Sequence, residues 1–291
     1  IGIYRAAKTL NKKAYIVIDN PTSSIIPLMN TFRDNQDYEA DMFVNNHEAK
    51  EIMDDNTLLV VVDTNKPSIT QCEDLLYMAK MIVVLDHHRQ GSDTIRNSVL
   101  SYIEPYASSA SEMVAEILQY FTEGIRIRNV EADSIYAGIM IDTDNFMQKT
   151  GVRTFEAAAF LRRCGADVTR VRKLFREDMN DYKARGETIR NAELFRGQFA
   201  ISECPSDYVD SPTVVGAQAA NELLNIVGVK ASFVLTEYKG VIYISARAID
   251  EVNVQIIMER MGGGGHLNMA GCQLETVDLE GARSLLKSTL T

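Results

Sequence analysis

The sequence is poor in cysteine and has no tryptophan. Its four cysteines are far apart and form no CxxC pair. This spacing indicates free thiols, as expected for a protein in a reducing, cytoplasmic compartment. The residues are Cys72, Cys164, Cys204 and Cys272.

Long hydrophobic runs are also missing. No stretch approaches the length of a membrane span and no signal peptide is visible, so we expect this segment to be soluble, without direct membrane contact. Acidic residues outnumber basic ones, and the net charge is −10. A negative net charge argues against extended electrostatic binding to duplex nucleic acid. A small phosphate ligand stays compatible with it, since bound divalent cations can reverse the local sign.

The beginning of the chain lacks an initiator methionine. Residues 1–10 have helical spacing and lead into an apolar strand at 14–18. A helix that feeds a parallel strand normally follows an earlier strand and loop. We therefore expect a further segment upstream of residue 1.

The pattern of apolar segments changes along the chain. Helical stretches alternate with apolar runs such as 57–62, 81–85 and 99–103, which predicts an α/β domain with a parallel sheet over residues 1–180. Charged residues with helical spacing follow and predict a connecting helix at 181–195. Residues 196–291 are then expected to form a smaller α+β domain with a mixed sheet, because two strands flank a Lys239-Gly240 turn.

One apolar run ends in a conspicuous polar motif. Residues 81–91 read MIVVLDHHRQG, so the run stops at Asp86-His87-His88. In open α/β sheets the ligand crevice lies beyond the carboxyl ends of the strands. Neighbours in an extended segment point to opposite sides, so one histidine can ligate a metal while the other meets a substrate. A plain polar loop is the ordinary alternative.

Two aspartates follow other apolar segments in the same way. Asp63 comes after the run at 57–62, and Asp142 after the helical stretch at 130–141. Together with His87 they form a carboxylate and imidazole set that suits Mn²⁺, with Mg²⁺, Fe²⁺ or Co²⁺ as substitutes. Each aspartate alone could equally be a turn residue or a helix stop.

Four consecutive glycines near the C terminus form the second signal. Gly262-Gly263-Gly264-Gly265 precedes His266, where a helix is expected to begin. Because glycine has no side chain, the backbone amides of such a segment can approach an anion closely and bind it. Arg247, at the end of a predicted strand, is a candidate phosphate-binding residue because its guanidinium group can donate hydrogen bonds to two oxygens at once. The alternatives are a flexible linker for the glycines and a surface ion pair for Arg247.

With these motifs in this order, the chain resembles the DHH phosphoesterase superfamily, and its C-terminal part resembles the first type of DHH-associated domain. The start of the chain and residues 101–120 (SYIEPYASSASEMVAEILQY) look most like the GdpP-type cyclic-di-AMP phosphodiesterases of bacteria. This resemblance implies two Mn²⁺ ions, with the first His and Asp-x-Asp motif of the family upstream of residue 1. It also implies a cytoplasmic domain of a membrane-anchored parent protein. By position, the implied metal ligands are Asp63, His87 and Asp142, the catalytic residues are Asp63 and His88, and the substrate-binding residues are Arg247, Gly264, Gly265 and His266.

The implied activity is hydrolysis of cyclic di-AMP to linear 5′-pApA. Two alternatives stay open at the level of the sequence. One is a nanoRNase-like hydrolase of short linear oligonucleotides, and the other is a module that binds cyclic dinucleotides without catalysis. A homodimer is a further expectation, through the apolar face of 113–121 or through the connecting helix, although these faces could also pack internally.

Overall fold

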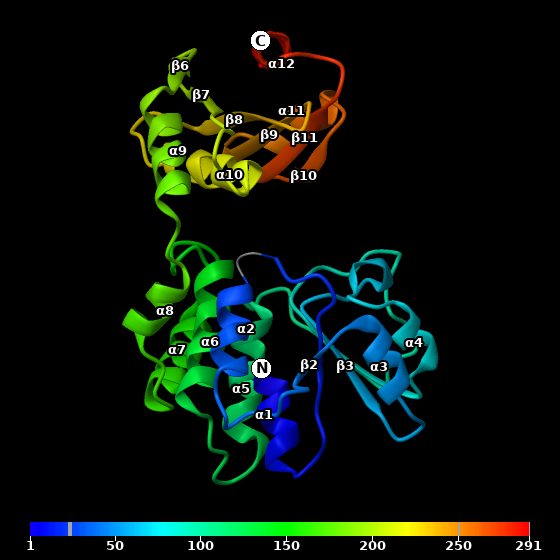
Figure 1. The fold of residues 1–291 in the computed structure, drawn as a ribbon. Helices are drawn as coiled ribbons and strands as arrows, with labels where there is room; N and C mark the ends of the chain where they lie inside the picture. Colours follow the sequence, from blue (N-terminus) through cyan, green and yellow to red (C-terminus); the bar gives the residue numbers. More distant parts are fainter. Residues whose placement is uncertain (23–24, 250, 291) are drawn as a thin grey trace. The chain divides into compact units, whose positions relative to one another are not determined.

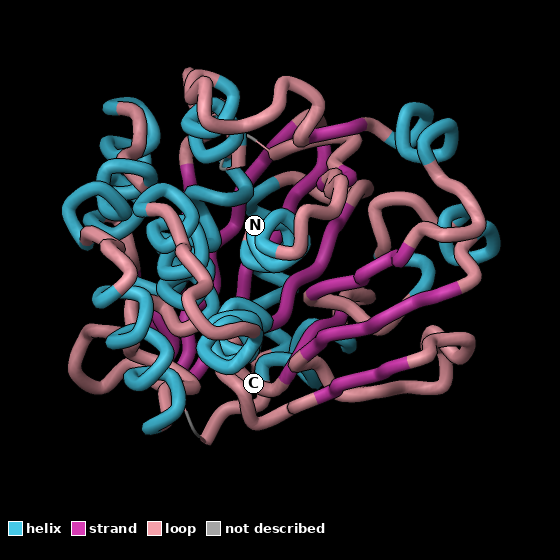
Figure 2. The backbone as a smooth tube through the Cα atoms, turned by 90° about the horizontal axis from the view of Figure 1, so that it is seen from below, coloured by secondary structure: helices cyan, strands magenta, loops and turns pink. Residues whose placement is uncertain are grey.

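The computed structural model describes residues 1–22, 25–249 and 251–290. The chain divides into two compact units, Ile1–Arg176 and Glu177–Thr291 (Figure 1). Figure 2 distinguishes the helices and strands of both units along the backbone. Among the described residues, none of the helices combines the length and the apolar character that a membrane span requires.

The first unit contains two small parallel sheets. The strands β3 (Leu58–Val62), β4 (Met81–Asp86) and β5 (Leu100–Ile103) lie side by side in that order, and β1 (Ile16–Val17) pairs with β2 (Phe43–Val44). The helices of this unit are α1 (Gly2–Thr9), α2 (Ile26–Arg33), α3 (Asn46–Ile52), α4 (Asp74–Met78), α5 (Ala110–Phe121), α6 (Asn129–Asp142), α7 (Val152–Arg163) and α8 (Val168–Leu174), with a 3-10 turn at Pro67–Ile69.

Three helices form the main core of the first unit. The apolar residues Met113, Ala115 and Leu118 of α5 are fully buried, and Leu118 packs in one cluster with Ile139 of α6 and Leu161 of α7. Ser109 starts α5, because its hydroxyl accepts a hydrogen bond from the Glu112 amide. The apolar face of α5 is therefore used inside the unit and is not available for pairing subunits.

The second unit is built on a mixed six-stranded sheet. Its strand order is β10-β11-β9-β8-β7-β6, and only the β7–β8 pair is parallel. The strands are β6 (Glu193–Phe195), β7 (Phe199–Cys204), β8 (Ala231–Tyr238), β9 (Val241–Ala248), β10 (Gly264–His266) and β11 (Met269–Leu274). The helices are α9 (Met179–Arg190), α10 (Pro212–Leu223), α11 (Val254–Arg260) and α12 (Leu279–Thr289).

The predicted fold class is confirmed: a parallel-sheet region is followed by a mixed-sheet region. The hairpin at Lys239-Gly240 is present, and both of its turn residues have positive φ angles of 52° and 76°. The predicted connecting helix at 181–195 overlaps α9, which is preceded by the separate helix α8. The two units divide between these helices, at Arg176 and Glu177, whereas the proposed boundaries at residues 180 and 195 stay a prediction.

One strand is less buried than its apolar sequence suggests, and one local prediction is wrong. In β3, Leu58 and Val62 at the ends are exposed and only Val61 is buried. His266 does not begin a helix, because it ends the strand β10. The glycines Gly264 and Gly265 belong to the same strand, which pairs with β11 through backbone hydrogen bonds.

Candidate active site

Two predicted metal ligands follow neighbouring parallel strands. Val62 of β3 is paired with Leu85 of β4, so the next residues along both strands leave the sheet at the same edge. The Asp63 amide donates a hydrogen bond of 2.9 Å to the Leu85 carbonyl. Asp63 has a φ angle of +64°, a left-handed conformation that aspartate tolerates better than most residues. This turn directs its carboxylate toward the end of β4.

His87 lies between two carboxylates. Its Nε2 is 3.3 Å from Oδ1 of Asp63 and 4.0 Å from Oδ2 of Asp142, the last residue of α6. Its Nδ1 is 3.3 Å from the Ala107 carbonyl oxygen. Because a carbonyl only accepts, Nδ1 carries the proton in the neutral ring and Nε2 keeps its lone pair for the side where the carboxylates lie.

The charges of this group shift its proton affinities. The Asp63 carboxylate beside His87 raises the pKa of the imidazole. Burial raises the pKa of the Asp142 carboxyl, and the neighbouring Asp63 charge adds to the rise. The first shift thus comes from an opposite charge beside the imidazole, and the second from burial together with a like charge. A cation at this position would relieve their repulsion.

Asp63, His87 and His88 form a group that could hold a metal ion. Each offers one ligand atom, and these atoms lie within 4.8 Å of one another. The set combines carboxylate oxygen with imidazole nitrogen, which fits a divalent transition metal. Asp142 joins this group through its 4.0 Å approach to His87. The residues therefore fit the metal that the sequence predicts, and the structure brings Asp63, His87, His88 and Asp142 together.

The sequence reasoning missed two supporting residues. Asp86 is fully buried, and its Oδ1 lies 2.7 Å from His88 Nδ1. Its Oδ2 accepts a hydrogen bond of 2.5 Å from the Asn65 side chain, which also donates to the His88 carbonyl at 3.3 Å. Asn65 is itself buried, and its Oδ1 has no partner among the described residues. The signal was an asparagine two positions after Asp63, at the same end of the parallel strands.

The second unit holds the other predicted residues on three neighbouring strands. Met269 of β11 is paired with Arg247 of β9 on one side and with His266 of β10 on the other. Directly opposed residues of antiparallel strands share a face, so the three side chains lie in one row. The Arg247 guanidinium is largely buried and its Nε has no partner in the described chain, and this burial lowers its pKa. Its Nη1 donates a hydrogen bond of 2.9 Å to the Ala246 carbonyl, and among the described residues no carboxylate pairs with it, so its Nε can receive an anion.

The glycines of β10 and the glycine just before it differ in what surrounds them. A Cβ at Gly263 would lie 2.1 Å from the Gly271 carbonyl oxygen, and one at Gly265 would lie 2.5 Å from the Ala270 Cα. A Cβ at Gly264 would meet no heavy atom within 4 Å. Gly263 and Gly265 are therefore needed for close packing against β11, whereas the Gly264 backbone faces open space.

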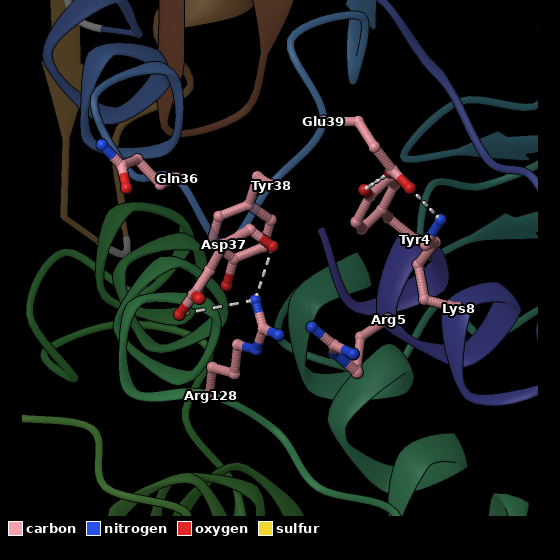
Figure 3. A pocket seen from close by; sticks show the side chains of 8 residues that line it. All are labelled: Tyr4, Arg5, Lys8, Gln36, Asp37, Tyr38, Glu39 and Arg128. Atoms are coloured by element: carbon pink, nitrogen blue, oxygen red, sulfur yellow. Dashed lines mark hydrogen bonds and ion pairs between the residues drawn. The ribbon is translucent and has the colours of Figure 1, made fainter.

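A separate cavity of about 190 Å³ in the first unit contains none of these residues. Its charged side chains pair with one another, as Figure 3 shows for Lys8 with Glu39 and for Arg128 with Asp37. Arg5 in its wall is paired with the buried Glu131. We regard these contacts as links between α1, α6 and the 36–39 segment. The cavity is lined by Tyr4, Arg5, Lys8, Gln36, Asp37, Tyr38, Glu39 and Arg128.

The chain was compared with known families and proteins. The DHH family, N-terminal domain, matches residues 1–139, and the DHHA1 domain matches residues 199–291. The chain is similar to a solved exopolyphosphatase-related protein from Bacteroides fragilis, with a TM-score of 0.82 at 20% identity over 99% of this chain and 86% of that one. At this identity the likeness supports the fold.

Curated relatives match the whole chain. It is 41% identical to the cyclic-di-AMP phosphodiesterase GdpP of Bacillus subtilis and 38% identical to the cyclic-di-AMP phosphodiesterase PdeA of Listeria monocytogenes, over 100% of this chain and 44% of each relative. The chain thus spans less than half the length of these relatives. It is also 25% identical to the bifunctional oligoribonuclease and PAP phosphatase NrnA of Thermus thermophilus, over 97% of this chain and 81% of that protein.

The two matched domains follow one another in the order of the two compact units. The first compact unit carries the cluster of Asp63, His87 and Asp142, of which Asp63 and His87 lie within the matched DHH domain, and the second unit carries the glycine strand with Arg247 and His266. With an N-terminal DHH domain and a C-terminal DHHA1 domain, the chain belongs to the DHH family.

Proposed function

We propose that this chain is the hydrolase part of a metal-dependent phosphodiesterase that converts cyclic di-AMP to linear 5′-pApA. The observation that carries the proposal is the convergence of two carboxylates on the Nε2 of His87, in a chain 41% identical throughout to a cyclic-di-AMP phosphodiesterase. Residues 1–180 would be the catalytic domain, 181–195 the connecting helix and 196–291 the substrate-binding domain. The whole would be a cytoplasmic part of a membrane-anchored protein.

Asp63, His87 and Asp142 are the proposed metal ligands, and the proposed metal is Mn²⁺, with two ions in the intact site. When bound, divalent cations of this kind polarise a phosphoryl oxygen and supply a nucleophile at neutral pH. The carboxylates of Asp63 and Asp142 would neutralise the positive charge. The Nδ1–H of His87, held toward the Ala107 carbonyl, would keep Nε2 unprotonated for ligation.

His88 is the proposed catalytic hydrogen-bond donor to the scissile phosphate, together with Asp63 at the metal. The Asp86 carboxylate faces Nδ1 of His88, so Nε2 is the nitrogen that remains for the substrate. A hydrogen bond from this nitrogen would stabilise negative charge that develops on the phosphate. His88 is more than half exposed, so a ligand can reach it.

Arg247, Gly264, Gly265 and His266 are the proposed substrate-binding residues of the second unit. The unpaired Arg247 Nε and the open backbone of Gly264 support an anionic ligand here. The row of Arg247, Met269 and His266 combines two donors with an apolar side chain, as a nucleotide requires. A homodimer stays part of the proposal, now through exposed Met179 and Tyr182 of α9, and its mass in solution tests it.

A second candidate is a hydrolase of short linear oligonucleotides. It is favoured by the likeness to the Thermus thermophilus oligoribonuclease, which extends over 97% of this chain. The metal group and the glycine strand would serve both substrates. Relative rates on the cyclic and the linear dinucleotide distinguish the two candidates.

The test uses the purified full-length protein, incubated with Mn²⁺ and either cyclic di-AMP or pApA. We expect pApA to accumulate from cyclic di-AMP, and Asp142→Asn to abolish both turnover and metal binding. Asp55→Asn is the matched control, because Asp55 is an exposed aspartate that pairs with Lys80. Binding of cyclic di-AMP without any hydrolysis would overturn the enzyme assignment, and faster cleavage of pApA would select the second candidate.

A further inference from the structure

A turn of unusual conformation follows Asp142. Three consecutive residues, Asp144, Asn145 and Phe146, have positive φ angles of 46°, 57° and 66°. None of them is glycine, and side chains with a Cβ adopt this region only where surrounding contacts hold them there. Strained backbone of this kind is concentrated at binding and catalytic sites.

Thr143 holds this turn in place. It is fully buried, and its carbonyl accepts hydrogen bonds from the amides of Met147 and Gln148 at 2.9 and 2.8 Å. Its hydroxyl accepts one from the Phe146 amide at 3.0 Å and donates one of 2.6 Å to the Ile139 carbonyl. The turn is therefore fixed to the same end of α6 that presents Asp142 to His87.

The turn places Phe146 in a row of aromatic rings. The Phe146 ring centre is 5.7 Å from that of Tyr136, at an interplanar angle of 59°. On the other side it stacks on Phe155 of α7, with the centres 5.9 Å apart and an angle of 17° between the planes. Tyr136 is buried in the core, whereas Phe155 is 58% exposed. The row thus begins with a buried ring and ends with a ring that is exposed to solvent.

We propose that the exposed ring of Phe155 stacks on an adenine base of the substrate while a phosphate of the same molecule lies at the metal group. This inference rests on the proposed function, because it takes cyclic di-AMP as the ligand. The support is chemical: bases stack on aromatic side chains irrespective of sequence, and a ring already supported by Phe146 loses little freedom when it binds. The position of the ring also supports the proposal, because the turn that holds Phe146 against Phe155 directly follows the proposed metal ligand Asp142 in the chain.

Two exposed apolar side chains from the same segment fit this role. Met147 is in the fixed turn, and Val152 begins α7. Methionine adapts to flat aromatic ligands through its flexible thioether. A nucleobase presents an apolar face with a polar edge, so an apolar platform next to a charged phosphate site suits a nucleotide better than an inorganic anion.

The absence of tryptophan from the sequence allows a direct test. Phe155→Trp introduces a single indole at the proposed stacking position, and stacked adenine quenches indole fluorescence. We expect cyclic di-AMP with Mn²⁺ to quench this variant, and inorganic phosphate to leave its emission unchanged. Tyr120→Trp, at an exposed position of α5 in the same unit, is the matched control and should not respond.

Kinetics give the second arm. Phe155→Leu keeps an apolar side chain but removes the π face, and it should raise KM for cyclic di-AMP by about tenfold with a smaller change in kcat. Phe155→Tyr should stay close to the unmodified protein. An unquenched Phe155→Trp together with an unchanged KM in Phe155→Leu overturns the stacking proposal, even if pApA is formed normally. Quenching without any hydrolysis supports stacking while it contradicts the enzyme assignment.

Discussion

The Nδ1 atom of His88 lies 2.7 Å from Oδ1 of Asp86, a carboxylate with 0% exposure at the end of β4. The sequence shows the two residues only as parts of one polar motif. In the structure their environments differ: the Asp86 side chain is buried, whereas the His88 side chain is exposed to solvent. A buried carboxylate that fixes an imidazole sets which nitrogen carries the proton and how the ring is oriented.

Replacing the Asp86 carboxylate by an amide should therefore lower turnover through His88. We expect Asp86→Asn to reduce kcat by about 10–100-fold, because an amide can donate as well as accept and so no longer fixes the Nδ1–H form and the orientation of the ring. Affinity for Mn²⁺ should change less, since the His87 contacts to Asp63 and Ala107 are independent of Asp86. Steady-state kinetics and metal titration measure the two effects.

The Asn65 variant separates orientation from folding. Asn65→Ala removes the hydrogen bond to Asp86 but leaves the carboxylate in place, so its kcat should fall less than that of Asp86→Asn. Nitrogen chemical shifts of His88 report the tautomer directly. Equal loss of kcat in both variants with an unaltered His88 tautomer would assign Asp86 a purely structural role.

A second buried carboxylate supports His87 indirectly. Glu112 is 1% exposed, and its Oε2 accepts hydrogen bonds of 2.5 Å from the hydroxyls of both Ser108 and Thr154. Ser108 directly follows Ala107, whose carbonyl faces His87. Glu112→Ala leaves these buried donors unpaired, so the free energy of unfolding should fall by about 2–5 kcal/mol. Urea denaturation measures the change.

Glu123→Ala, at an exposed position beyond the end of α5, is the control for this substitution and should unfold like the unmodified chain. Metal affinity of Glu112→Ala should also decrease, because the loop that orients His87 loses its anchor. Full stability and full metal binding in this variant would show that the loop is held by other contacts.

The sequence was sufficient to predict the group around His87, because the carboxyl ends of parallel strands meet at one edge of a sheet. The Asp63 and His87 positions follow from that rule alone. The role of Asp86 does not, since the motif does not reveal which of its side chains point into the core. The buried amide of Asn65 was overlooked for the same reason.

Two other features depend on contacts between distant residues. The strand β10 is rich in glycine, which has low strand propensity, and it forms because Gly265 within it and Gly263 just before it allow close packing on β11. The left-handed turn at 144–146 contains no glycine and is stabilised by the buried Thr143. Local sequence patterns carry no signal for either.

The phenol of Tyr38 provides a test at alkaline pH. Burial raises its pKa to about 12, and the Glu131 carboxylate, to which its hydroxyl donates at 3.0 Å, adds to the rise. The folded state therefore holds this proton more tightly than the unfolded chain, whose pKa is about 10. The associated stability is present below about pH 10 and is lost as the pH rises toward about 12.

Tyr38→Phe cannot ionise and should lose less stability than the unmodified chain between these two pH values. Urea denaturation at a series of pH values measures the difference, with Tyr120→Phe as the exposed control. Parallel stability curves for the Tyr38→Phe variant and the unmodified chain would contradict the raised pKa.

Adjacent glycines of the second unit should respond differently to the same added methyl group. Gly263→Ala places a Cβ within 2.4 Å of the Cys272 Cβ and closer still to the Gly271 carbonyl, so the strand pair must separate. We expect it to lower the free energy of unfolding by about 1–3 kcal/mol. Gly264→Ala adds a methyl group in open space and should fold normally, yet it should weaken binding of cyclic di-AMP because it occupies the side where the ligand is proposed to lie. Thermal unfolding and equilibrium binding distinguish the two variants, and normal binding by folded Gly264→Ala would remove this strand from the substrate site.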